Sequence, residues 1–461
     1  MPDEINRWTS RLTNLESKSP ACAVEISAAA GADCRLAGRD AEITPLPSFL
    51  AALAILFLTL TFFVQPPARG QDQEEVKGAP AELTDEQEVR EQIAAVEKLQ
   101  HSLPDRGAAL YFLAVSKQHL RETREALALL KECLALHEGF DPSGEPAFLE
   151  LKSSKEFTAM VDGVHQDYRV VAQAREAFRT IEKDLVPEGL AYDEPRNVFY
   201  LSSLNRRKIV KIGRDGVPSD FVPPDRFGLL PVLGIRVDPN DDTVWADSFT
   251  DSTALTELLH FDATGGLLGR FKPPGAAKHG FNDLVIRKGG EVLTTDSLAN
   301  AVVRFDPAAR TFTTLSLHRP LFYPNGIALS SDDRTLYVAD YLGVVAIDLL
   351  NNQSHDVDPG PRSTLAGVDG LYWHNGSLIA IQNGIGKPRI AAFHLATDGF
   401  HVTRTTVLEN RSNLLAMPTT GAIRGSDFFF IANSQIENMN NDKVMDVTKL
   451  EVVRIGVLRL P

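Results

Sequence analysis

Hydrophobic and polar positions follow two different patterns along this chain, and the pattern changes near residue 177. Between residues 87 and 176, apolar side chains recur every three or four residues, as in an α-helix that buries one face. From residue 177 to residue 461, short stretches of alternating apolar and polar residues are separated by Gly, Asp, Asn and Ser. This second pattern is typical of β-strands joined by turns. We therefore predict a helical segment followed by a mainly β domain.

The helical segment is predicted to contain two amphipathic helices on either side of the polar stretch HLRETRE. Small and apolar residues stand where the two helices of a tetratricopeptide repeat (TPR) pack together: Leu110, Leu113, Ala114, Ala126 and Leu130. One clear copy is present, followed by the degenerate PAFLELKSSKEFTAMV. Fewer than three repeats do not bury a continuous core. We therefore expect this segment to lean on the β domain, as a spacer or as a module that contacts another protein.

The β domain contains one motif six times: a small or polar residue, then Gly or Asp, then alternating apolar residues. The copies begin 43 to 51 residues apart, which is the length of one four-stranded propeller blade. The fold predicted is a six-bladed β-propeller, closed by LEVVRIGVLRL at the end of the chain together with AFRTIE from Ala177. The six copies are EGLAYD from Glu188, LGIRVD from Leu233, NDLVIR from Asn282, NGIALS from Asn325, DGLYWH from Asp369 and TGAIRG from Thr420.

The first residue of each motif begins the strand that lines the central channel of a propeller. Five of these six side chains carry oxygen: Glu188, Asn282, Asn325, Asp369 and Thr420. Crowded carboxylates repel one another unless a cation lies between them. An all-oxygen set favours calcium, with magnesium or manganese as substitutes, whereas zinc is disfavoured without His or Cys. Asn and Asp before Gly are also common turn residues, which is the competing explanation for every position except Glu188.

Composition narrows the classes of partner. The 461 residues carry 61 acids against 47 bases, a net charge of −14, and no run of Lys and Arg stands out. This balance argues against nucleic acid and anionic lipid and is compatible with binding a cation. The three cysteines, Cys22, Cys34 and Cys133, all precede the propeller. A disulfide framework or a thiolate metal site is therefore excluded there.

An uncharged run of seventeen residues extends from Ser48 to Val64. Its length lies between that of a signal-peptide core and that of a membrane span, and a buried helix is the third alternative. We predict residues 1–44 as a tail, 45–70 as a signal peptide or membrane anchor and 71–86 as a polar linker. Both favoured alternatives place the rest of the chain outside the cytoplasm, either periplasmic or secreted, or anchored by residues 48–64.

The motifs EGLAYD, FNDLVIRKGGEVLTTDS, NGIALSSDDRTLYVADY and DGLYW resemble the SMP-30/gluconolactonase/luciferin-regenerating-enzyme family over about residues 185–435. That resemblance implies a divalent metal held by Glu188, Asn325 and Asp369. It also implies that Asn282 contacts substrate or metal-bound water. Gly280 occupies the position where some relatives carry a substrate-binding Arg, so the substrate itself is not implied.

The resemblance implies a metal-dependent hydrolase of lactones or related cyclic esters. Asp369 would act as ligand and as general base on water, Asn282 would orient water or substrate, and His279 is a further candidate for substrate binding. The alternative is a non-catalytic binding propeller with a structural metal, in which the helical segment contacts a protein. We expect three other acids, which end strands in ADS, TDS and ADY, to make structural turn contacts: Asp247, Asp296 and Asp340.

Overall fold

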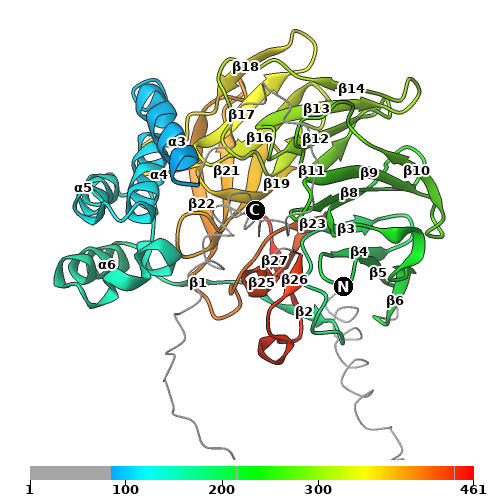
Figure 1. Ribbon diagram of the computed structural model, residues 1–461, viewed down its shortest axis with the longest axis horizontal. Helices are drawn as coiled ribbons and strands as arrows, with labels where there is room; N and C mark the ends of the chain where they lie inside the picture. The colour runs from blue at the N-terminus through cyan, green and yellow to red at the C-terminus, as the bar shows by residue number, and fades with distance from the viewer. Residues whose placement is uncertain (1–84, 214–215, 441) are drawn as a thin grey trace, which may run out of the picture.

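A computed structural model describes residues 85–213, 216–440 and 442–461 of the chain. Within them, six β-sheets form a ring, and a group of helices lies against one side of it (Figure 1). The predicted tail and the uncharged run at 48–64 fall outside the described residues. Among the helices that are described, none has both the length and the apolar character needed to cross a membrane.

The first three sheets each contain four antiparallel strands that are consecutive in the chain. Blade 1 contains β3 (Leu190–Asp193), β4 (Val198–Ser203), β5 (Lys208–Ile212) and β6 (Pro218–Val222). Blade 2 contains β7 (Val232–Val237), β8 (Val244–Thr250), β9 (Leu255–Phe261) and β10 (Leu267–Phe271). Blade 3 contains β11 (Phe281–Ile286), β12 (Val292–Asp296), β13 (Ala301–Asp306) and β14 (Thr311–Thr314). Each begins with the strand that carries the repeated motif.

Blades 4 and 5 continue the same order. Blade 4 contains β15 (Ile327–Leu329), β16 (Thr335–Asp340), β17 (Gly343–Asp348) and β18 (Gln353–Asp356). Blade 5 contains β19 (Val368–His374), β20 (Ser377–Gln382), β21 (Arg389–Leu395) and β22 (Val402–Asn410), with the short β1 (Val171–Ala172) added at its outer edge. The predicted six-bladed propeller is therefore present in the described residues once the ring is closed.

Blade 6 closes the ring with strands from both ends of the described chain. It contains β23 (Gly421–Arg424), β24 (Asp427–Ile431), β27 (Arg454–Arg459) and, as its outer strand, β2 (Arg175–Arg179). Because β2 pairs with β27 from Arg175↔Val457 onward, the propeller begins and ends in the same sheet. The predicted contribution of the segment around Ala177 to closure is confirmed. Joining the two ends in one sheet removes an open edge that would invite aggregation.

Close packing at the axis explains the glycine in the motif. A Cβ atom on Gly189 would lie 2.2 Å from the Leu233 carbonyl oxygen, and one on Gly326 would lie 2.3 Å from that of Asp369. In both cases the obstacle is the first motif residue of the next blade. In these two blades the innermost strands thus approach so closely that a side chain is excluded at this position.

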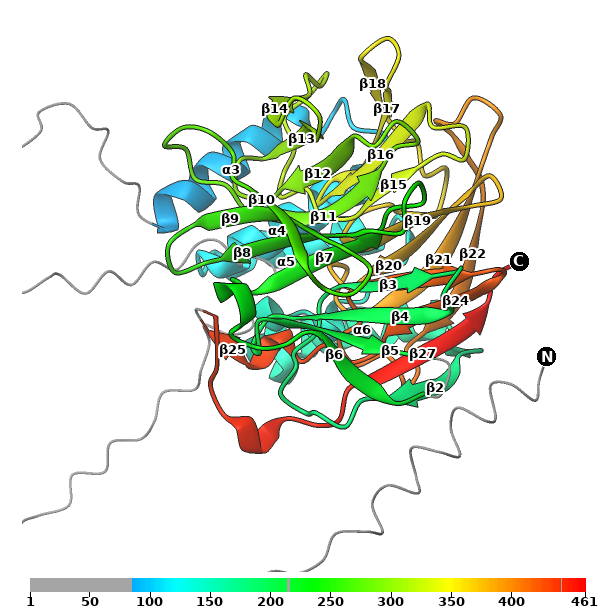
Figure 2. The same ribbon diagram turned by 90° about the vertical axis from the view of Figure 1, so that its right-hand side faces the viewer.

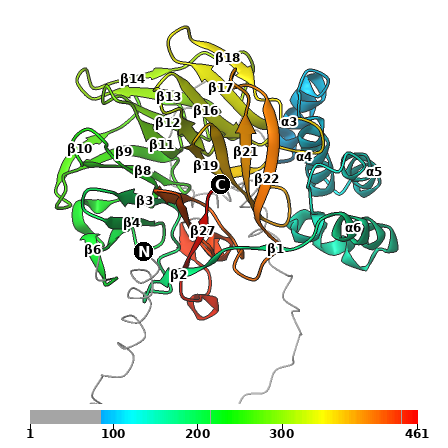
Figure 3. The same cartoon turned by 180° about the vertical axis from the view of Figure 1, so that it is seen from behind.

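The helical unit, residues 85–167, packs on blades 4 and 5 (Figures 1 and 3). It contains α3 (Asp85–Leu99), α4 (Arg106–His119), α5 (Thr123–Leu134), the 3₁₀ turns η1 (Pro142–Gly144) and η2 (Pro146–Ser153), and α6 (Lys155–Asp167). Helix α4 is buried along most of its length, between α5 and the propeller residues Phe322, Leu342, Ala366 and Ile385. The two predicted helices are α4 and α5, and their likeness to a TPR stays a prediction.

A second element lies at the same end of the ring as helices α3 to α5 (Figure 2). Between β24 and β27 the chain forms η4 (Ile436–Asn438), a hairpin of β25 (Met439–Asn440) and β26 (Lys443–Val444), and η5 (Val447–Lys449). Met439 and Val444 pack with Val186, Leu204 and Leu233 at the starts of blades 1 and 2. At this end of the ring, the hairpin therefore packs on blades 1 and 2, whereas the helical unit packs on blades 4 and 5.

Candidate metal centre

The five oxygen-bearing motif residues lie at or just before the starts of the innermost strands of five blades. The hydroxyl of Thr420 donates to the Glu188 carbonyl oxygen, which links the last blade to the first. The side chain of Asn325 is within hydrogen-bonding reach of Asp369, and the charge of Asp369 acts on Glu188. Glu188, Asn325 and Asp369, the three predicted metal ligands, therefore come together at the axis.

Each of these three side chains has a buried oxygen without a hydrogen-bond partner among the described residues. The atoms are Oε2 of Glu188, Oδ1 of Asn325 and Oδ1 of Asp369. Glu188 is 5% exposed and Asp369 is 7% exposed, so water access is slight. Buried polar atoms in native proteins nearly always have partners, and an exception calls for a ligand or an ion. Unpaired oxygens on three motif residues of neighbouring strand starts therefore mark the axis as the candidate site.

The electrostatics at the axis also favour a bound cation. Burial raises the pKa of Glu188 well above its ordinary value, and the carboxylates of Asp369 and Asp283 raise it further. Burial also raises the pKa of Asp369 to about 7, although hydrogen bonds from Asn383 and Asn325 oppose this. Two carboxyl groups held this way are costly when ionised, and a divalent cation between them removes that cost.

The oxygens present fit a hard cation. Two carboxylates and the amide carbonyl of Asn325 match the ligands that calcium prefers, and magnesium or manganese would accept them too. No group of three or more His, Cys, Asp or Glu side chains in the described part of the chain is arranged to hold a metal. The candidate set contains only two residues of those types, and its third member is an amide.

Asn383, which the sequence did not single out, orients Asp369. Its Nδ2 donates to Oδ2 of Asp369 and, at 3.0 Å, to the Pro418 carbonyl oxygen. Asn383 follows β20, beside the start of β19, so it reaches Asp369 from within the same blade. Since Oδ2 already accepts a hydrogen bond from Asn383, Oδ1 is the oxygen left for a ligand. Only the pairing of β19 with β20 brings these two residues together.

A buried ion pair lies next to the candidate ligands and was also missed. Arg236 Nη2 is 2.8 Å from Oδ2 of Asp283, and its guanidinium carbon lies 5.6 Å from the centre of the Tyr372 ring. Asp283 takes the motif position that is glycine in the other five blades. The positive charge of Arg236 lowers the pKa of Glu188, which favours the ionised form of that candidate ligand.

Asn282 and His279 are held by different partners. Asn282 is buried and its Nδ2 donates to Ser297 Oγ at 3.0 Å. His279 Nδ1 lies 2.5 Å from Oδ2 of the buried Asp296, so the imidazole is engaged within blade 3. Roles for Asn282 and His279 toward a substrate stay predictions.

Of the three acids expected to make turn contacts, two do so in the same way. Oδ1 of Asp296 accepts from the backbone of Gly280 and Ala299, and Asp340 accepts from Phe322, Leu342 and the Arg319 guanidinium. Asp247 is different.

The strand pairing places Asp247 one residue earlier than its supposed counterparts. Val232 pairs with Ser248 as Phe281 pairs with Asp296, so Ser248 is the true equivalent of Asp296. Oδ2 of Asp247 accepts from Thr294 Oγ1 at 2.9 Å, while its buried Oδ1 has no partner among the described residues. The likeness of ADS to TDS in the sequence was therefore misleading by one position.

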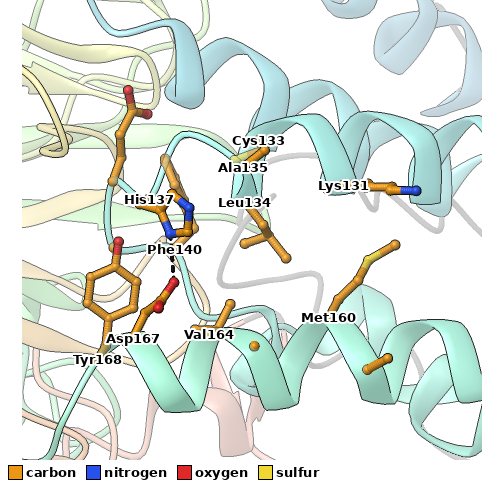
Figure 4. Close-up of a pocket in the computed structure, with 14 residues that line it drawn as sticks. Lys131, Cys133, Leu134, Ala135, His137, Phe140, Met160, Val164, Asp167 and Tyr168 are labelled. Atoms are coloured by element: carbon orange, nitrogen blue, oxygen red, sulfur yellow. Dashed lines mark hydrogen bonds and ion pairs between the residues drawn. The ribbon is translucent and has the colours of Figure 1, made fainter.

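A cavity of about 200 Å³ lies elsewhere, between α5 and α6 of the helical unit (Figure 4). Leu134, Met160 and Val164 form its apolar wall, and His137 and Asp167 form a hydrogen-bonded pair of 2.6 Å at one end. None of the axial residues lines this cavity.

Ser143, His165 and Asp141 also meet in the helical unit, but not as a catalytic triad. Ser143 Oγ lies 3.4 Å from His165 Nε2, and Oδ2 of Asp141 lies 3.3 Å from the same nitrogen. A triad needs the carboxylate on the opposite ring nitrogen, where it orients the base. Asp141 also accepts from the Ser143 backbone, so this cluster serves to stabilise the turn η1.

No family model matches the chain, and no curated protein matches it. Similar solved structures include a gluconolactonase from Xanthomonas campestris, at 19% identity over 60% of this chain and 86% of that chain, with a TM-score of 0.42. A virginiamycin B lyase from Staphylococcus aureus is 17% identical over 62% and 99%, with a TM-score of 0.43. A luciferin-regenerating enzyme is 14% identical over 61% and 95%, with a TM-score of 0.44.

A gluconolactonase and a luciferin-regenerating enzyme are thus among the proteins that this propeller resembles, as the motifs implied. Lyases are also among the similar solved structures. A shared fold hosts several reactions, so it does not select one.

Proposed function

We propose that this protein is a divalent-metal-dependent hydrolase of lactones or related cyclic esters, with calcium as the metal. The observation that supports it is the set of three buried oxygens without partners on Glu188, Asn325 and Asp369. A set of residues that only stabilised the ring would have its oxygens satisfied, because an unpaired buried acceptor costs about 1–3 kcal/mol.

In this proposal Glu188, Asn325 and Asp369 hold the ion, which when bound polarises the ester carbonyl and stabilises the oxyanion. The chain's own side chains then divide the remaining work. Asp369 accepts the proton of the attacking water as general base, oriented by the hydrogen bond from Asn383. Asn282 orients the water or the substrate, and His279 is kept as a substrate-binding candidate.

The test is hydrolysis of a panel of aldonolactones and acyl lactones, followed by acid release, with EDTA and then with calcium restored. Activity that is lost on chelation and recovered with calcium is expected. Asp398→Asn is the matched control for any substitution of Asp369, because Asp398 is an exposed acid in the β21–β22 turn of the same blade. Calcium binding without turnover of any lactone would overturn the hydrolase proposal.

A binding propeller with a structural metal is the second candidate. The observation that favours it is the helical unit, which contains the cavity between α5 and α6 (Figure 4). In this case a protein partner would bind the helical unit. Substitution of Met160 at the cavity wall by Lys would then abolish binding of that partner while leaving calcium binding unchanged.

The proposed location outside the cytoplasm rests on the uncharged run from Ser48 to Val64. Fractionation of cells that express the whole chain tests it. Recovery in the periplasm or medium would support a cleaved signal, recovery with membranes would support an anchor, and recovery in the cytoplasm would contradict both.

A further inference from the structure

The helical unit pairs with the loop that joins β20 to β21 in blade 5, residues 383–388. The Asp141 N–H donates to the Ile385 carbonyl oxygen at 3.0 Å. The Lys387 N–H donates to the Asp141 carbonyl oxygen at 2.9 Å. Asp141 and Gly386 thus form an isolated parallel β-bridge between the helical unit and the propeller.

The two backbones touch at this bridge. A Cβ atom on Gly386 would lie 2.0 Å from the Asp141 carbonyl oxygen. A Cβ atom on Gly144, in the turn η1, would lie 2.8 Å from both the Gly386 carbonyl oxygen and the Lys387 nitrogen. Contacts this short exclude a side chain from either glycine, so the position of η1 and the position of the loop are coupled.

The same loop contacts the segment that leads to Asp369. The Gly384 N–H donates to the Gly367 carbonyl oxygen at 3.0 Å. A Cβ atom on Gly367 would lie 2.5 Å from the Gly384 carbonyl carbon. Gly367 precedes Asp369 by two residues. The loop is therefore in contact both with the helical unit and with the start of the strand that carries a candidate metal ligand.

The helical unit also supplies the apolar support of the loop. Ile385 is fully buried, in the same cluster as Leu130, Phe140 and Phe148 of the helical unit. Asp141 is in turn fixed within the helical unit, because its Oδ1 accepts from the Ser143 N–H at 3.1 Å and caps η1. The segment that supports the loop is thus itself held in place.

Asn383, the first residue of the loop, connects it to the axial site. Strand β20 ends at Gln382, so the sheet fixes the backbone only up to the residue before Asn383. Asn383 Nδ2 donates to Oδ2 of Asp369 and to the Pro418 carbonyl oxygen, which uses both of its hydrogens. A displaced loop would therefore lose one of these two bonds. Oδ1 of Asp369 has no partner among the described residues.

We propose that the turn η1 of the helical unit positions a residue of the axial site. By pairing with the β20–β21 loop, Asp141 holds Asn383 where it binds Oδ2 of Asp369 and leaves Oδ1 to the metal. The helical unit is then part of the support of the metal centre rather than only a spacer. The proposal rests on the proposed metal for its effect on calcium binding, but not on the hydrolysis of lactones.

The first test needs neither metal nor turnover. In metal-free ¹⁵N-labelled protein, the side-chain NH₂ resonances of Asn383 are assigned by their loss in Asn383→Ala. Gly144→Ala adds a methyl group that pushes η1 away from Gly386, so these resonances should shift or broaden. Gly289→Ala is the matched control, because a Cβ atom there meets nothing within 4 Å. Resonances that stay in place in Gly144→Ala would overturn the proposal.

The second test measures coupling by calorimetry. Gly144→Ala should weaken calcium binding about tenfold, as expected when a residue that orients a ligand is disturbed. It should cause no further loss in an Asn383→Ala background, because both changes act on the same hydrogen bond. Calcium affinity equal to that of the unaltered chain, or losses that add, would show that η1 does not act through Asn383.

A second pair of variants tests the contact from the side of the propeller if Gly144→Ala does not fold. Gly386→Ala places a methyl group against the Asp141 carbonyl oxygen, and Gly376→Ala is its control. Both glycines belong to blade 5 and have positive φ angles, +88° and +76°, but a Cβ atom on Gly376 meets nothing within 4 Å. Only Gly386→Ala should shift the Asn383 resonances and weaken calcium binding. Equal effects of the two variants would overturn the proposal.

The outcomes separate this proposal from the proposed function. If the unaltered chain turns over no lactone but binds calcium, the hydrolase fails, and the calcium affinities of the variants still decide the role of η1. If the unaltered chain binds no calcium, the metal assignment fails, and the resonances of Asn383 decide whether η1 positions that residue.

Discussion

Two buried aspartates of this protein stand in opposite situations, although both are almost inaccessible to solvent. Asp105 lies where the helical unit meets the propeller, and each of its oxygens has partners. Oδ1 accepts from the Ala108 N–H at the start of α4, and Oδ2 accepts from Thr364 Oγ1 and the Leu365 N–H at 2.8 Å each. Asp369 lies at the axis, and its Oδ1 has none among the described residues.

The difference separates a structural carboxyl from the proposed metal ligand. Asp105 caps a helix and joins it to the propeller, so its hydrogen bonds account for its burial. Burial still raises the pKa of Asp105, to about 6, against the opposing effect of those bonds. Burial also raises the pKa of Asp369, but Asp369 lacks a complete set of hydrogen-bond partners. Burial alone therefore does not mark a functional acid, and the proposed role of Asp369 depends instead on its unsatisfied oxygen.

The largest expected effect is that of Asp369→Ala. Turnover should fall by at least about 1000-fold, because the change removes both a proposed metal ligand and the proposed general base. Calcium binding, measured by calorimetry, should weaken, while the free energy of unfolding in urea without calcium should not fall, since an unsatisfied carboxyl is removed. Full turnover by this variant would refute the assignment of Asp369.

Asp105→Ala should show the opposite behaviour. It should lower the free energy of unfolding by about 2–4 kcal/mol, because a helix cap is lost and two propeller donors are left unpaired. Its calcium affinity should equal that of the unaltered chain. Urea denaturation and calorimetry measure the two quantities. A variant with weakened calcium binding but unchanged stability would break the comparison between the two aspartates.

The pH dependence of stability should also report on Asp105 when the unaltered chain is compared with a variant. Its pKa is about 6 in the folded chain and about 4 when unfolded, so the folded state binds the extra proton in between. Its contribution is present below about pH 4 and is lost as the pH rises through about 6. The difference in stability between the unaltered chain and Asp105→Asn should shrink over this range, as measured by urea titrations at several pH values. A difference that grows instead would contradict this assignment.

The smallest effect is expected for Asp247→Asn. Burial raises the pKa of Asp247 well above its ordinary value, which favours the neutral form, and an amide is a close replacement for that form. Calcium affinity should change by less than about threefold, or below ~0.7 kcal/mol. A tenfold loss of affinity would show that its unsatisfied Oδ1 belongs to the metal site and would extend that site into blade 2.

Much of the fold could be predicted because the repeat is encoded locally. The motif spacing identified six blades, and Glu188, Asn325 and Asp369 stood at equivalent positions in it. Local likeness failed where strand register mattered. Asp247 looked equivalent to Asp296 in the sequence. Its structural position, however, is set by the register in which its strand pairs with the first strand of the blade, not by the neighbouring residues.

Residues whose partners are distant in the sequence could not be predicted. Asp105 meets Leu365 from 260 residues away. Ser297 and Asn383 look like ordinary loop residues until strand pairing places them behind Asn282 and Asp369. His279 was a candidate for the substrate, and only the structure shows that its ring is engaged by Asp296.

The sequence by itself determined the number of blades, the helices before them and the oxygen-bearing residues at the head of each innermost strand. These features depend on alternation and spacing within a few tens of residues, which the chain carries locally. The tertiary structure decided which buried oxygens have partners, how β2 and β27 close the ring and where the helical unit packs. Such outcomes depend on contacts between blades and across the whole chain, because hydrogen-bond satisfaction is a property of the assembled fold.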